Sequence, residues 1–117
     1  MKDKVVKRSE IKINIGLNEE KIPVEMNWQA DDNPDFQNPQ ACKAMILALF
    51  DDNTKDTLRM DLWTKDMQVV EMDRFFFQTL RAMADTYYKA TQNAQLATDM
   101  RRFVNYFGEQ TEIIPKS

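Results

Sequence analysis

Residues 11–17, IKINIGL, place an apolar side chain at every second position, and residues 22–30, IPVEMNWQA, repeat the alternation. A period of two is typical of a strand that buries one face. The polar segment 18–21 between the two runs is turn-like, so the pattern predicts an antiparallel hairpin. Pro23 has no N–H to donate, and this favours a position at the start of its strand or on a sheet edge.

The region after this hairpin predicts a loop and then a helix. Residues 31–38 are rich in turn-forming residues. Asn38 followed by Pro39 is typical of a helix start, because asparagine caps and proline suits the first helical position. Five residues then share one helical face: Ala41, Ala44, Met45, Ala48 and Leu49. We therefore expect a first helix over residues 39–50, ended by the polar run 51–54.

The rest of the chain predicts a third strand and two more helices. Residues 58–62 alternate again and predict a strand that ends near Trp63 and Thr64. Residues 69–91 predict a long helix with one polar stripe roughly 80° wide. A last helix is expected from Asn93 to about Phe107, with Gly108 either just beyond its end or as a weak point inside it.

The three consecutive phenylalanines of the long helix, Phe75 to Phe77, cannot face one surface, since three successive residues span about 200° of a helix. This helix must therefore be covered on its flanks as well as on its main face. The sheet, the other helices and a second protein chain are the alternative covers.

The predicted order is strand, strand, helix, strand, helix, helix. This order indicates an α+β fold, in which a small three-stranded antiparallel sheet packs on helices. At 117 residues the chain has the length of one domain. We expect residues 1–8 to form a basic N-terminal arm and residues 9–117 to form a single domain.

The composition excludes many enzyme classes. The chain has no histidine, and its two glycines, Gly16 and Gly108, are isolated, so neither a histidine-based triad nor a glycine-rich phosphate loop can form. We expect no enzyme activity and no cofactor. A net charge of −3 argues against nucleic acid as a partner. The lone Cys42 suits a reducing compartment and is interpreted as a small buried helix residue.

The sequence also predicts where the protein acts. Its basic start lacks the apolar segment of a signal peptide, and its longest apolar run, residues 44–50, is far too short to span a bilayer. We expect a cytoplasmic protein, with any peripheral membrane association made through a partner.

Acidic residues cluster in two loops, Asp31, Asp32 and Asp35 in one, and Asp51, Asp52 and Asp56 in the other. Neither loop has the glycine and glutamate offsets of an EF-hand, so we interpret them as capped and solvated loop ends and expect no metal. Asp61 and Asp66 flank Trp63 and form the most suggestive carboxylate pair for acid–base chemistry. Catalysis by them is the weakest of the functional alternatives.

The chain has more aromatic side chains than one small sheet needs, and this is the feature of the sequence that indicates a contact surface. We predict that a partner or a second copy contacts four residues: Trp63, Phe75, Phe77 and Tyr88. The alternative is that neighbouring helices bury them as core. A rival function is small-molecule binding in a pocket between the sheet and the long helix, lined by Trp28, Met60, Trp63 and Met83.

Two stretches resemble a known family. Residues 61–67, DLWTKDM, are followed by FF at 75–76, QTL at 78–80 and MADT at 83–86. These stretches resemble the gliding motility-associated GldC family, and the similarity extends over about residues 9–110. Gln68 stands where the resemblance leads us to expect proline.

The resemblance implies a non-catalytic accessory component of the gliding machinery. It implies partners among the proteins of that machinery, including the lipoprotein GldB, in direct or indirect contact. A bacterial lipoprotein lies across the membrane from a protein that has no export signal. Either the contact with GldB is indirect, or the protein reaches it by a route that the sequence does not show. A homodimer is also compatible with the apolar surface described above.

Overall fold

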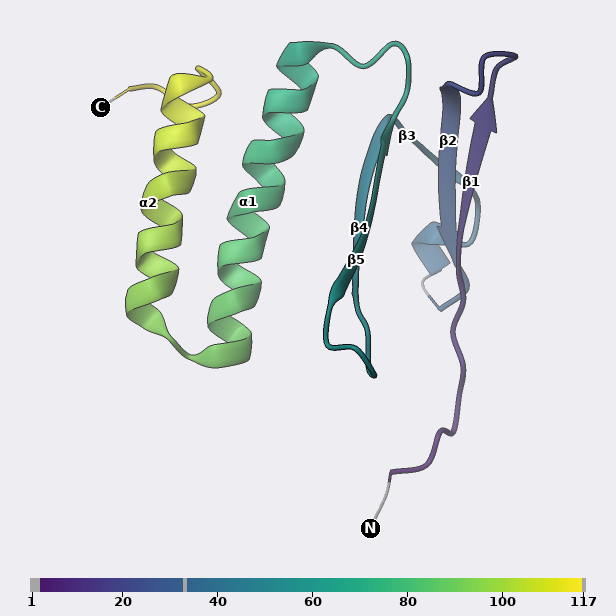
Figure 1. The fold of residues 1–117 in the computed structure, drawn as a ribbon, viewed down its shortest axis with the longest axis horizontal. Coiled ribbons are helices and arrows are strands. Elements are labelled where there is room, and N and C mark those ends of the chain that lie inside the picture. The colour runs from purple at the N-terminus through teal and green to yellow at the C-terminus, as the bar shows by residue number, and fades with distance from the viewer. Residues whose placement is uncertain (1–2, 33, 117) are drawn as a thin grey trace. The chain divides into compact units, whose positions relative to one another are not determined.

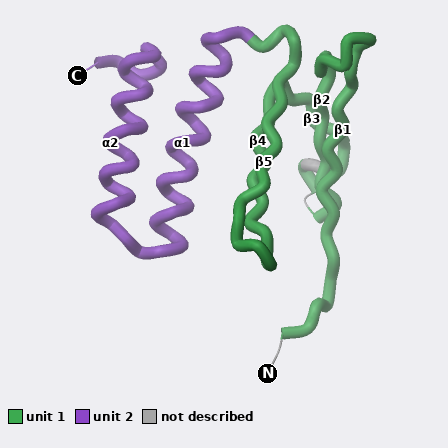
Figure 2. The backbone as a smooth tube through the Cα atoms, in the orientation of Figure 1, with its two compact units in different colours: residues 1–67 green, residues 68–117 purple. Residues whose placement is uncertain are grey.

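The computed structural model describes residues 3–32 and 34–116, and it divides the chain into two compact units. Unit 1 ends at Met67 and contains the strands, and unit 2 begins at Gln68 and contains the helices (Figure 2). The predicted α+β class is confirmed. The predicted arm at residues 1–8, of which 1–2 lie outside the described residues, and the predicted single domain over 9–117 stay predictions.

The first hairpin of unit 1 is confirmed. Strand β1 (Ile11–Leu17) pairs antiparallel with β2 (Pro23–Ala30), and β2 pairs antiparallel with β3 (Gln40–Cys42) (Figure 1). The register sets Ile15 opposite Met26, and Met26 is only 1% exposed. Apolar residues of β1 and β2 therefore share one face of this sheet, as their alternation predicts.

The turn of this hairpin shows why Pro23 is tolerated. The Asn18 N–H donates to the Ile22 carbonyl at 3.0 Å, and a bulge lies between Gly16 and Leu17. Pro23 stands opposite Leu17, next to that hydrogen-bonded pair. Hydrogen-bonded and non-hydrogen-bonded pairs alternate in an antiparallel ladder, so the missing proline N–H removes no bond to β1.

The predicted helix over residues 39–50 is wrong. These residues form β3 and a further strand, β4 (Ala44–Phe50), with only Lys43 between them. Residues 44–50, AMILALF, contain no polar residue, and a short apolar run fits a helical face as well as a strand. Cys42 accordingly lies in a strand, not a helix, and is half-buried.

The third predicted strand is confirmed as β5 (Thr57–Trp63), but it pairs with β4 in a separate two-stranded sheet. A three-stranded antiparallel sheet is present, as predicted, but its third strand is β3 and not β5. The predicted order ββαβαα matches only in part, because five strands in two sheets precede the two α-helices. The opposed residues of one β4–β5 face are all apolar: Met45, Leu47, Leu49, Leu58, Met60 and Leu62.

Unit 2 is a hairpin of two antiparallel helices, α1 (Val69–Thr91) and α2 (Ala94–Gln110) (Figure 1). Both predicted helices are confirmed. At the start of α1 the Gln68 N–H donates to the Glu71 carboxylate at 3.0 Å, a bond that a proline at position 68 could not make. The Asn93 side chain caps α2 by accepting from the Leu96 N–H at 3.0 Å.

The two helices meet along a seam of small residues. Ala84 and Ala97 are completely buried, and Gly108 is also buried. Gly108 lies inside the last turn of α2, as the second of the two predicted alternatives has it, and the Phe77 ring packs against it. A Cβ at position 108 would stand 2.6 Å from Phe77 Cε1, so only glycine permits this approach.

Candidate functional site

A continuous apolar face runs across unit 2, beside the seam. On α1, Phe76 and Met83 lie about 100–120° from Phe77 around the helix axis, and on α2, Phe103 lies about 100° from Val104. Because the helices run antiparallel, these two directions fall on the same side of the hairpin. We call the following residues the apolar face: Met72, Phe76, Leu80, Met83, Leu96, Met100, Phe103 and Phe107.

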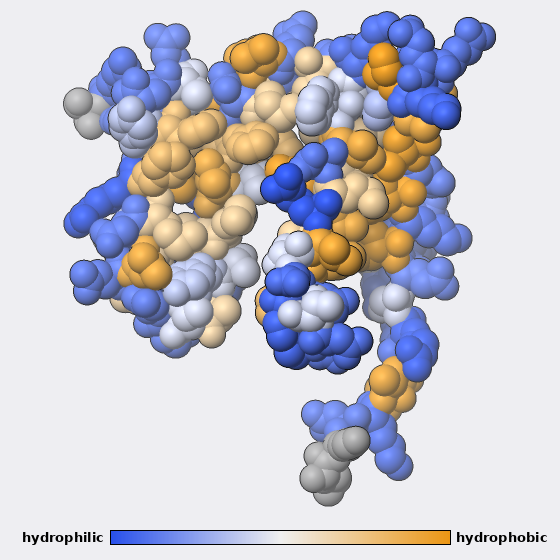
Figure 3. All heavy atoms as spheres, in the orientation of Figure 1, coloured by the Kyte–Doolittle hydropathy of each residue, from blue (hydrophilic) through white to orange (hydrophobic). Residues whose placement is uncertain are grey.

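Half of this face is exposed. The exposed fractions are 40% for Phe76, 55% for Met83 and 52% for Phe103. In Figure 3 apolar side chains gather over both helices of this unit. The ring of Phe103 also lies beside that of Phe107 in a tilted arrangement, with ring centroids 6.4 Å apart. Contiguous exposed apolar surface of this kind marks sites of protein–protein contact.

Along the opposite edge of the seam, polar side chains make an ion pair and contacts with aromatic rings. Arg101 of α2 donates to the Asp85 carboxylate of α1 at 3.1 Å, and its guanidinium lies 5.8 Å from the centre of the Tyr88 ring. Arg81 lies 5.2 Å from the centre of the Phe77 ring. The Arg101 contacts join the two helices along this edge, and the Arg81 contact lies within α1. On the side of the apolar face, the nearest charged residues by helical position are Asp73, about 40° from Phe77, and Asp99, about 140° from Val104.

The four contact residues predicted from the sequence lie in different environments. Trp63, at the end of β5, is 54% exposed, and Tyr88 is 37% exposed. Phe75 is half-buried, on the side of α1 away from the seam. Phe77 is 5% exposed and packs in the seam, which indicates a packing role. Their role in contacting a partner stays a prediction.

A shallow pocket adjoins Trp63 within unit 1. Its volume is about 310 Å³, and it is lined by Ile22, Pro23, Asp61, Leu62, Trp63 and Lys65. The pocket predicted from the sequence also included Met83, which belongs to unit 2, and Met60 and Trp28, which do not line this cavity. Trp63 is the residue that the two share.

Comparison with known families gives the chain an identity. The family model described as "Gliding motility-associated protein GldC-like" matches residues 23–113. The chain belongs to the GldC-like family. The matched range runs from β2 to the segment after α2, so it contains the whole apolar face. No curated protein and no solved structure matches the chain.

Membership in the GldC-like family confirms the resemblance carried by residues 61–86 and associates the chain with gliding motility. The family's description names this association and no catalytic activity. Within the described residues, neither helix is long and apolar enough to cross a membrane.

The carboxylates beside Trp63 do not form an acid–base pair. Asp61 pairs with Arg59, with Nε and Oδ2 2.7 Å apart. Asp66 accepts a hydrogen bond from the Thr64 hydroxyl at 2.7 Å, which lowers the pKa of the Asp66 carboxyl. A general acid at neutral pH would need a raised pKa, whereas the pKa of Asp66 is lowered.

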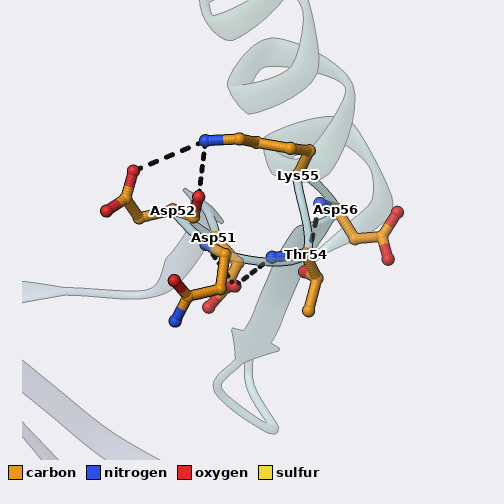
Figure 4. Close-up of polar contacts among 6 residues, drawn as sticks. Asp51, Asp52, Thr54, Lys55 and Asp56 are labelled. Atoms are coloured by element: carbon orange, nitrogen blue, oxygen red, sulfur yellow. Dashed lines mark hydrogen bonds and ion pairs between the residues drawn. The ribbon is translucent and has the colours of Figure 1, made fainter.

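The acidic run at residues 51–56 is the turn that joins β4 to β5 (Figure 4). The Asp51 carboxylate accepts from the N–H of Thr54 at 2.8 Å and of Asn53 at 3.0 Å. Lys55, at a φ of 62°, pairs with the Asp52 carboxylate at 3.5 Å. In the described residues, this turn included, no group of three or more His, Cys, Asp or Glu side chains is arranged to hold a metal ion.

Replacing Asp51 should cost stability in a pH-dependent way. The two backbone bonds lower the pKa of the Asp51 carboxyl in the folded state. Stability from this group is therefore present above its unfolded pKa of about 3.9 and is lost as the pH falls through the folded value. We expect Asp51→Asn to lower the melting temperature at pH 7 and the difference from wild type to shrink toward pH 3, as measured by circular dichroism.

The matched control for this experiment is Asp52→Asn. It removes a neighbouring charge, but the Asp52 carboxylate accepts none of the turn's backbone N–H bonds described above. An equal loss in both variants, or a difference that grows toward acid pH, would contradict the assignment of this stability to the two N–H bonds of the Asp51 carboxylate.

Proposed function

We propose that this protein is a non-catalytic accessory component of the gliding-motility machinery, which acts by binding another protein through the apolar face of unit 2. Family membership supports the association with motility. The observation that carries the binding role is the exposure of Phe76, Met83 and Phe103 on one side of a hairpin whose seam is already packed. Large aromatic and methionine side chains are typical of the centre of protein interfaces.

The partner we propose is a protein of the same machinery, with the lipoprotein GldB as the named candidate, reached directly or through a second component. Cytoplasmic location and membrane association through the partner belong to this proposal. The contact is apolar at its centre, where Phe76, Met83 and Phe103 are exposed, and polar at its rim, where Asp73 and Asp99 flank the apolar face by helical position.

The experiment that tests this function is affinity capture from a native lysate of a gliding bacterium, with solubilised membranes included. We expect the wild-type protein to recover gliding components. The Phe103→Asp variant should recover at least about tenfold less of them, because the new carboxylate stands at the centre of the contact. Asn105→Asp is the matched control, since it adds the same charge to the opposite side of α2.

Two results would overturn the proposal. One is equal recovery of the gliding components by wild type, Phe103→Asp and Met83→Asp. The other is loss of cooperative unfolding in both apolar-face variants, which would show that the chain itself covers this face. Capture of no gliding component from a lysate that contains them would instead favour the second candidate function, binding of a small molecule in the pocket beside Trp63.

A further inference from the structure

Strand β1 leaves one row of backbone groups without a strand partner. It is the outer strand of the order β1-β2-β3. The Asp31 N–H donates to the Glu10 carbonyl, which identifies Glu10 and Asp31 as a hydrogen-bonded pair of the ladder. Such pairs recur at every second residue, so the N–H and C=O groups of Ile11, Ile13 and Ile15 point away from β2.

Among the described residues no strand lies beyond this edge, and no backbone bond outside the ladder involves the three isoleucines. Leu17 follows the same orientation, because its neighbour Asn18 forms the next hydrogen-bonded pair with Ile22. The edge therefore offers seven residues of extended backbone to another strand.

This edge carries little of the protection usual for edge strands, and the bulge of its ladder lies at its end, between Gly16 and Leu17. β1 contains no proline, and Lys12 is its single charged residue, on the polar face of the sheet. The other strands differ: β3 has three residues, β5 carries Arg59 and Asp61, and β4 is apolar on both faces. Among the described strands, β5 also has a long free edge with one apolar and one more polar face, but its polar face carries the Arg59–Asp61 ion pair, whereas β1 carries Lys12 alone.

The sequence of β1 is complementary to itself. If two copies of β1 pair antiparallel about Asn14, Ile13 faces the partner's Ile15 and Ile11 faces the partner's Leu17. On the polar face, Lys12 faces the partner's Gly16 and Asn14 faces its own copy. In this register all apolar side chains lie on one face of the joined sheet, and no two like charges stand opposite each other. Both the alternation of side chains and their charges therefore allow the pairing.

The hydrogen bonding fits the same register. The outward-pointing residues are at odd positions from 11 to 17, and this register pairs odd positions with odd positions, which makes them the hydrogen-bonded pairs. Asn14 then stands in a non-hydrogen-bonded pair on the two-fold axis. The arrangement also brings Arg8 of one copy toward the turn that carries Glu19 and Glu20 in the other.

We propose that this protein forms a homodimer by antiparallel pairing of β1 with β1 of a second copy, centred on Asn14. The two three-stranded sheets then become one continuous sheet with no exposed β1 edge. The proposed pairing is made by residues of β1, so the variants that test it differ from those that test the binding of a gliding component.

A cysteine placed on the two-fold axis tests this register. In the full-length chain with Cys42→Ser, Asn14→Cys should oxidise to a covalent dimer on a non-reducing gel, since Cα atoms of such pairs lie about 4.5 Å apart. Lys12→Cys in the same background is the matched control on the same face. Its two copies would lie about 13 Å apart, too far for a disulfide, so we expect cross-linking about tenfold slower or less.

Ile13→Pro tests the backbone pairing. The Ile13 N–H points outward, so proline removes an edge donor without removing a bond to β2. We expect a wild-type dimer and an Ile13→Pro monomer by sedimentation, with unchanged circular dichroism. A monomeric wild type, equal cross-linking of the two cysteine variants, or a dimer that survives in folded Ile13→Pro would overturn the proposal. If Ile13→Pro does not fold, the cysteine pair decides.

Discussion

Phe77→Asp should unfold the helical unit, whereas Phe76→Asp should leave it folded. The two phenylalanines are adjacent in α1, but Phe77 is 5% exposed and Phe76 is 40% exposed. Truncating a buried phenylalanine costs about 3–5 kcal/mol, and a buried unpaired carboxylate adds to that. Small domains have about 5–15 kcal/mol in total, so this loss removes most of the stability.

The measurement is far-UV circular dichroism with urea denaturation of both variants in the full chain. We expect Phe77→Asp to lose most of its helical signal at 25 °C and Phe76→Asp to keep a cooperative transition. The adjacent position is the matched control, because it receives the same charge in the same helix. A folded Phe77→Asp that no longer binds its partner would instead support the sequence-based assignment of Phe77 as a contact residue.

Gly108→Ala should also destabilise the chain, although alanine favours helix by about 1 kcal/mol over glycine. The added Cβ would stand 2.6 Å from Phe77 Cε1 and 3.0 Å from Ile114 Cγ1. The Phe77 ring is buried and cannot move aside freely. Overpacking of this kind costs about 1–3 kcal/mol, so the net effect is a loss of stability.

A double-mutant cycle with Phe77→Leu isolates this contact. Leucine has no ring at the crowded position, so Gly108→Ala should cost less in the Phe77→Leu background than in wild type. Asn105→Ala, on the exposed side of α2, should be neutral or stabilising in the same urea titration. Equal costs of Gly108→Ala in both backgrounds would show that Phe77 is not the residue that excludes a side chain at position 108.

The sequence predicts most of this fold because periodicity and caps agree. The alternation of residues 11–17 and 22–30 identifies the first hairpin, and Asn93 marks the start of α2. The prediction fails at residues 39–50 because Asn38 and Pro39 resemble a helix start and the apolar run 44–50 has no polar residue to set a period. The missed signal is the pairing of that run with residues 57–63 across the polar turn at 51–56.

The candidate site could be predicted only in part. Three successive phenylalanines predict that α1 is apolar on several sides, but they do not predict which of the three rings is exposed. That choice depends on the seam, and the small residues Ala84, Ala97 and Gly108 locate it. Once they are recognised, Phe77 falls in the seam and Phe76 on the face beside it. The sequence-based choice of Phe77 for contact lacked this information.

The division of the chain into two units also sets an order of synthesis. Every described strand lies before Met67, so the sequence of the strands is translated before the first residue of α1 is added. At about 5–20 residues per second, the ribosome needs roughly 3–10 s more to make the helices. During that interval a nascent chain presents its β1 edge without its helical unit, and neighbouring chains on one messenger would be close enough to pair while they are still being translated.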